Sequence, residues 1–140
     1  RDLIVTGVQT CALPIYRAHA IAVQANATLS IIHVIEPINF AYGGDIPMDL
    51  TAIQEQLDEH AREKLRTIGH NYQIPEERQF VIAGLPQHEI HRIAMEEKAD
   101  LVVVGSHGRH GLSLLFGSTS NGVLHGAKCD VLAVHVPENS

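Results

Sequence analysis

The chain has 140 residues, enough for one domain with a continuous buried core. Its 16 aspartates and glutamates against 10 lysines and arginines give a formal net charge of −6, which excludes the basic surface of a nucleic-acid binder. No apolar run of about 18 residues is present and the first residues lack the series of a signal peptide, so we expect no membrane span. Two cysteines, Cys11 and Cys129, make neither a disulfide framework nor a metal site, and we therefore expect a cytoplasmic protein.

The first 15 residues, RDLIVTGVQTCALPI, differ in character from the rest of the chain. Their first half favours a strand. The whole stretch also resembles one translated frame of a common indexed sequencing adapter, with Leu3 and Ile4 at the index codons and the other 13 positions matching. We interpret residues 1–15 as an assembly artefact that replaces the natural N-terminus, and a genuine, divergent first strand is the alternative. Resequencing the locus across codon 16 distinguishes the two.

From residue 16 onward, short β-branched segments alternate with helical patterns. Near-continuous apolar runs predict buried strands at residues 29–34, 79–83 and 101–104 and from Val131 to Val136. Helices are predicted at residues 17–27, 50–70, 86–98 and 118–127, and residues 36–49, with two prolines and two adjacent glycines, predict a long irregular loop. Because strands and helices alternate, we expect a single α/β domain with a parallel sheet and helices on both of its faces.

The longest predicted helix, residues 50–70, carries an apolar stripe and is therefore amphipathic. Its members recur at steps of three and four residues: Leu50, Ile53, Leu57, Ala61, Leu65 and Ile68. We expect the charges on the other faces, such as Glu63 and Lys64, to be solvated.

A glycine-rich segment follows the predicted strand at residues 101–104. The chain passes Gly105, Gly108, Gly111 and Gly117 before a helix begins near Ser118. Glycines let backbone N–H groups approach a ligand closely, and a helix N-terminus favours an anion, so this order indicates a phosphate-binding loop. The alternative is a loop that only connects strand to helix, because glycine spacing by itself is weak evidence.

Three motifs resemble the universal stress protein family, and most closely its bacterial members related to universal stress protein A. They are GSHGRHGLSLLFGSTSNGVL (residues 105–124), IIHVIEP (residues 31–37) and GLPQHEIHRIA (residues 84–94), and the similarity covers residues 16–136 in order. The resemblance implies a five-stranded parallel sheet of the Rossmann-like, adenine-nucleotide alpha-hydrolase-like type. It also implies a homodimer formed through the last strand, and either an ATP-binding or a non-binding branch of the family.

The resemblance carries nucleotide contacts over onto seven residues: Val34 beside the adenine, Val104 and Gly105 at a strand end, Gly108, and Gly117, Ser118 and Thr119 around the ribose and phosphates. Two departures from the family's pattern weaken the prediction of ATP binding. The family's loop has nine residues between its second and third glycines, whereas eight residues separate Gly108 from Gly117. The family's acidic residue after the first strand falls at Thr6, which has no carboxylate.

Other chemistry receives little support from the sequence. The histidine pairs His88 with His91 and His107 with His110 lack the convergent third and fourth ligands of a metal site, so we expect no metal except Mg²⁺ with a nucleotide. No nucleophile elbow and no P-loop lysine is present, so no catalytic residue is assigned. We therefore expect a regulatory ATP-binding dimer or, alternatively, a non-binding dimeric interaction protein; an enzyme comes third, with at most slow, incidental ATP hydrolysis.

Overall fold

The computed structural model describes residues 2–6, 13–36, 50–107 and 122–136. Five strands in this part of the chain form one sheet: β1 (Asp2–Val5), β2 (Thr28–Ile35), β3 (Gln79–Ala83), β4 (Leu101–His107) and β5 (Asp130–Val136). Their order is β3-β2-β1-β4-β5, and every neighbouring pair is parallel. The predicted α/β domain with a five-stranded, Rossmann-like parallel sheet is confirmed.

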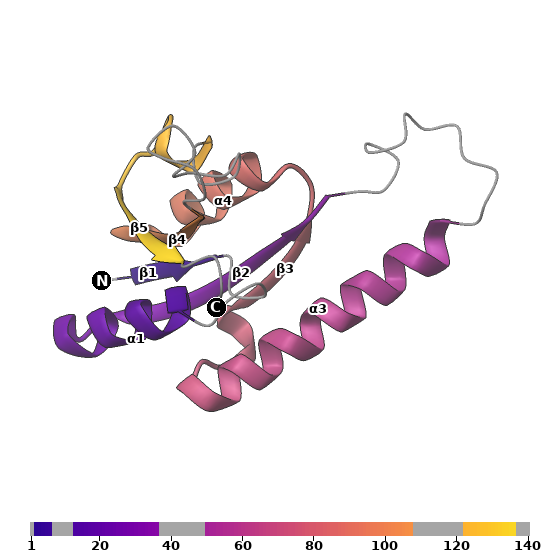
Figure 1. Ribbon diagram of the computed structural model, residues 1–140, viewed down its shortest axis with the longest axis horizontal. Helices are drawn as coiled ribbons and strands as arrows, with labels where there is room; N and C mark the ends of the chain where they lie inside the picture. The colour runs from indigo at the N-terminus through magenta and orange to yellow at the C-terminus, as the bar shows by residue number, and fades with distance from the viewer. Residues whose placement is uncertain (1, 7–12, 37–49, 108–121, 137–140) are drawn as a thin grey trace.

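Helices cover both faces of the sheet, as predicted (Figure 1). On one face α1 (Leu13–Ala25) packs on β1, β4 and β5, and α3 (Leu50–Tyr72) packs on β2 and β3. On the other face lies α4 (Pro86–Glu96), which packs against β2 and begins with the proline that the first helical turn accepts. The sheet is therefore the middle layer of three.

The central strand β1 is buried from both sides because successive side chains of a strand point to opposite faces. Leu3 and Val5 join the apolar cluster under α1 and α3, and Ile4 joins the cluster under α4. All three are at most 3% exposed. This double burial explains the near-continuous apolar runs of the strands.

Backbone hydrogen bonds fix β1 to β4 at both ends. The N–H of Asp100 donates to the carbonyl oxygen of Asp2 at 2.8 Å, and the N–H of Thr6 donates to that of Val103 at 3.0 Å. The segment that resembles an adapter therefore forms the centre of this sheet, while its origin stays a prediction. It also supplies the first turn of α1, which begins at Leu13 rather than at residue 17, because Pro14 is accepted there and buried.

The long helix α3 is buried over only part of its length. Ala61 and Leu65 are enclosed, at 2% and 0% exposure, but Ile53 and Leu57 are 37% and 42% exposed, so the apolar stripe of this amphipathic helix is buried only in part. A helix of 23 residues is about 35 Å long, whereas the five residues of β3 span about 17 Å. The first half of α3 therefore projects beyond the ends of the strands (Figure 1). Except for Glu36, the loop predicted at residues 36–49 lies outside the described residues.

Candidate functional site

The direction of strand succession reverses at β1. From β1 the chain adds β2 and β3 on one side, then returns to add β4 and β5 on the other. After β1 the chain continues into α1 on one face, and after β4 it reaches Val123 in the cluster on the opposite face. Connections that diverge in this way open a crevice outside the carboxyl ends of the two strands, and ligands of open α/β sheets bind there.

The carboxyl edge of the sheet is stepped at this crevice. Val5, the last residue of β1, pairs with Ile31 on one side and Val103 on the other. Both neighbouring strands continue for four more residues, to Ile35 in β2 and His107 in β4, which is about 13 Å of additional strand. The end of β1 is thus set back between two longer strands.

Thr6 occupies the set-back position, directly after β1. It is 7% exposed, and its backbone N–H is held by Val103. The family resemblance predicted that Thr6 takes the place of the family's acidic residue. The structure locates Thr6 at the edge of the sheet that borders the crevice. A threonine hydroxyl donates and accepts hydrogen bonds there without charge.

Three of the predicted ligand contacts lie on the two strands that flank Thr6. Val34 is half-buried near the end of β2, and Gly105 is half-buried in β4, in register with Val134 of β5. Val104 is 1% exposed and packs with Ile4 under α4, so contact with a ligand is left to its main-chain atoms. The topology thus brings Val34, Val104 and Gly105 to one edge.

The other four predicted contacts, Gly108, Gly117, Ser118 and Thr119, lie outside the described residues. The described chain resumes at Gly122 with a helical turn over residues 122–124. The helix predicted to run to residue 127 ends before that point, because Gly126 adopts a φ of +84° and breaks the helical path.

His91 of α4 holds the chain that follows the glycine-rich segment. Its Nε2 lies 3.2 Å from the carbonyl oxygen of Gly122 and 3.3 Å from that of His125. Because both partners only accept hydrogen bonds, Nε2 carries the proton. His91 therefore anchors the turn at residues 122–125 to α4. In the described part of the chain, no three histidine, cysteine or acidic side chains gather as metal ligands.

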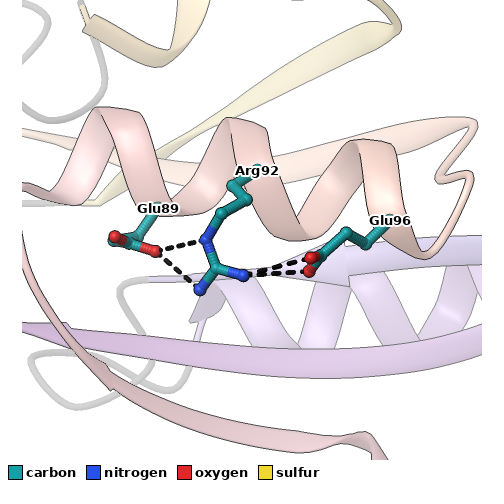
Figure 2. A network of polar contacts seen from close by, with 3 residues as sticks. All are labelled: Glu89, Arg92 and Glu96. Carbon is teal, nitrogen blue, oxygen red and sulfur yellow. Dashed lines mark hydrogen bonds and ion pairs between the residues drawn. The ribbon is translucent and has the colours of Figure 1, made fainter.

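An ion-pair network runs along α4, centred on Arg92 (Figure 2). Arg92 Nη2 lies 2.7 Å from Glu89 Oε2, and Nη1 lies 3.0 Å from Glu96 Oε2. The hydrogen bond that Arg92 donates to Glu89, with the charges of both carboxylates, raises the pKa of Arg92 above its ordinary value. The Glu89 side chain is only 22% exposed. These charges stabilise the helix and bind each other.

An open cleft of about 560 Å³ lies where α3 projects past the sheet. Ile35 and Ala83, the last residues of β2 and β3, form its floor, and side chains of α3 form its wall. Arg62 in that wall pairs with Asp58 at 2.8 Å. Sequence analysis did not single this cleft out, because it depends on the angle between a helix and two strand ends. The other lining residues are Gln54, Glu55, Glu59 and Arg66.

The stepped edge and the helices on both faces define an open, doubly wound α/β protein. The sequence model of the universal stress protein family matches residues 3–135. The chain belongs to this family. Within the described residues, no helix has the length and apolar character needed to cross a membrane.

Relatives and solved structures agree with this assignment. Universal stress protein A homolog 1 of Coxiella burnetii is 42% identical over 123 residues, covering 87% of this chain and 85% of that protein. Universal stress protein UspA from Lactobacillus plantarum has the same fold, with a TM-score of 0.73 and 20% identity over 95% of this chain and 96% of that one. A universal stress protein solved in complex with cAMP superposes with a TM-score of 0.64 at 26% identity, over 96% of each chain.

Proposed function

We propose that this chain is a regulatory module that binds an adenine nucleotide, with ATP as the first candidate, at the stepped edge between β2 and β4. The observation that carries the proposal is the set-back end of β1 between two longer strands, with Thr6 at its base and Val34 and Gly105 on its flanks. A base and ribose fit against strand ends, while the glycine-rich segment from residue 105 supplies N–H groups for phosphates.

The solved relative that binds cAMP supports an adenine nucleotide as the ligand class. Mg²⁺ would accompany a bound ATP, through its phosphates. Val34 is the half-buried apolar contact for the base, and the main chain of Val104 and Gly105 is the contact at the end of β4. Gly108, Gly117, Ser118 and Thr119 are the proposed contacts with the ribose and phosphates. No residue is proposed to be catalytic.

A second candidate is a dimeric interaction protein that binds no nucleotide. The observation that favours it is Thr6, which provides no carboxylate for a base or ribose and is 7% exposed. The segment between Gly108 and Gly117 is also one residue shorter than the family's ATP motif, with eight residues in place of nine. Both candidates form a homodimer through β5, an edge strand of the sheet that has one neighbour, β4.

Calorimetry and nucleotide extraction separate the two candidates. The purified chain is titrated with ATP, ADP and cAMP in the presence of Mg²⁺, and any nucleotide that co-purifies is extracted and identified. Saturable heat from one of the three supports the nucleotide module. Absence of heat and of bound nucleotide, both in this chain and in one with Asp in place of Thr6, favours the interaction protein.

A further inference from the structure

A cavity of about 180 Å³ lies between α4 and the chain that leads into β5. Its apolar wall comes from α4, from the approach to β4 and from residues on either side of Gly126: Ala94, Met95, Ala99, Val102, Val123, Ala127 and Cys129. It is formed at the amino end of β4, whereas the proposed nucleotide edge is at the carboxyl end. The cavity is therefore a separate site.

Small side chains make up the inner part of the wall. Three alanines and Cys129 line it together with Val102 and Val123, which are 2% and 0% exposed. Burial, followed by the charges of Asp130 and Asp100, raises the pKa of the Cys129 thiol, so this side chain is an apolar wall group. An apolar cavity of about 150 Å³ holds a molecule the size of benzene.

Two exposed lysines, Lys98 and Lys128, add positive charge to the lining of the cavity. The carboxylates nearest to Cys129 do not line it, and Asp100 accepts a hydrogen bond from the backbone N–H of Asp2 at 3.2 Å. The Nε2 proton of His91, a further lining residue, is directed at backbone carbonyls. The charged side chains that line this cavity are thus the two lysines.

Lys98 stands where the backbone favours glycine. It lies two residues after α4 with a φ of +54°, and the N–H of Ala99 donates to the carbonyl oxygen of Ala94 at 2.8 Å. This left-handed conformation costs conformational free energy for a residue with a Cβ. The chain thus carries a charged side chain beside the cavity at a position where glycine would be less strained.

We propose that this cavity binds a small amphiphilic anion, with an apolar body of about six to eight heavy atoms in the cavity and a carboxylate group beside Lys98 and Lys128. The apolar body replaces empty space against the alanines, Val102 and Cys129. The two ammonium groups attract the carboxylate at the surface, where each is worth a modest gain in affinity.

The test measures protection of Cys129 from alkylation by iodoacetamide in the full chain carrying Cys11→Ser, which leaves one thiol. Benzoate is the probe, and benzyl alcohol is its neutral match in size. We expect saturating benzoate to slow alkylation several-fold and benzyl alcohol to protect at clearly higher concentration. Lys98→Gly relieves backbone strain, so it preserves the fold, and it is expected to weaken benzoate protection about two- to five-fold.

Ala127→Leu is the filling variant, in which added side-chain volume occupies the cavity and benzoate no longer protects. Lys128→Ala is a second charge variant, at an exposed position, and it tests the attraction of the carboxylate even if the filling variant fails to fold. The proposal is overturned when benzoate leaves the alkylation rate of Cys129 unchanged. It is also overturned when benzyl alcohol protects as well as benzoate, or when Lys98→Gly and Lys128→Ala both bind benzoate with unaltered affinity.

Discussion

The backbone N–H of Thr6 donates a hydrogen bond to the carbonyl oxygen of Val103 at 3.0 Å. This bond fixes Thr6 at the base of the step between β2 and β4, on the crevice where the strand order reverses. The side chain at position 6 therefore lies at the base of the proposed nucleotide site.

Thr6→Asp is expected to strengthen nucleotide binding. A carboxylate at this position accepts hydrogen bonds from the base or ribose, and a hydrogen bond to a charged group contributes about 1.5–3 kcal/mol, or at least about tenfold in affinity. Calorimetric titration with ATP measures the change. Because residue 6 is 7% exposed, the same substitution should destabilise the free protein by about 1–3 kcal/mol.

Thr6→Asn is the matched control, since it has nearly the same shape as aspartate without the charge. It should leave the ATP affinity within a few-fold of the parent chain. Equal affinities for the Asp and Asn variants would contradict a role for charge at this position.

The dimer proposed through β5 is tested at its exposed apolar side chain. Leu132 is 36% exposed on this edge strand, so Leu132→Glu places like charges at the contact of two copies and should convert a dimer into a monomer. Light scattering reports the mass. Leu124 is 37% exposed but lies on the turn after the glycine-rich segment, so Leu124→Glu should leave the mass unchanged. Dissociation by both variants, or by neither, would count against a β5 interface.

A pH dependence is expected from His33 of β2. Burial, followed by the positive charge of Lys64, lowers the pKa of His33 in the folded chain below its ordinary value of 6.5. Above pH 6.5 the histidine is neutral in both states and adds no pH dependence. As the pH falls below 6.5 the unfolded chain binds the proton first, so stability declines until the pH passes the lower folded pKa.

Urea unfolding at several pH values measures this decline. His33→Asn should show a shallower loss of stability between about pH 7 and pH 5 than the parent chain. Lys64→Gln, at an exposed position of α3, removes the repelling charge and should lessen the decline without abolishing it, because burial remains. Parallel curves for the parent and the His33→Asn chains would show that another group is responsible.

Sequence patterns predicted those parts of the fold that depend on local burial. Residues 79–83 form β3 with the predicted bounds, and α4 begins at Pro86, the predicted first residue of that helix. The exposure of Ile53 and Leu57 could not be predicted, because it follows from the lengths of α3 and β3 rather than from periodicity.

The candidate site was predictable only in part for a similar reason. Glycines after a buried strand indicate a loop at a strand end, and Gly105 lies there. The step at Thr6 depends on how many residues β2 and β4 extend beyond the end of β1. The cavity beside Cys129 depends on small residues from segments that are distant in the sequence. Neither relationship leaves a pattern within a short window of sequence.

Gly84→Ala is expected to destabilise the fold, because Gly84 joins β3 to α4 in a conformation that few other residues adopt. Its φ is +155°, and its N–H donates to the carbonyl oxygen of Ile35 at 3.0 Å. An added Cβ would lie 2.8 Å from Cγ of Glu89, which Arg92 holds in place. Strain and overlap together predict a loss of about 1–3 kcal/mol, measured by urea unfolding.

The same substitution in a Glu89→Ala background separates the overlap from the backbone strain. With the glutamate side chain removed, the overlap at Cγ disappears and only the cost of the φ at Gly84 remains. The penalty for Gly84→Ala should therefore be smaller in that background, and the difference is the coupling between the two positions. An equal penalty in both backgrounds would assign the entire effect to the backbone and would show that Glu89 moves aside freely despite its ion pair with Arg92.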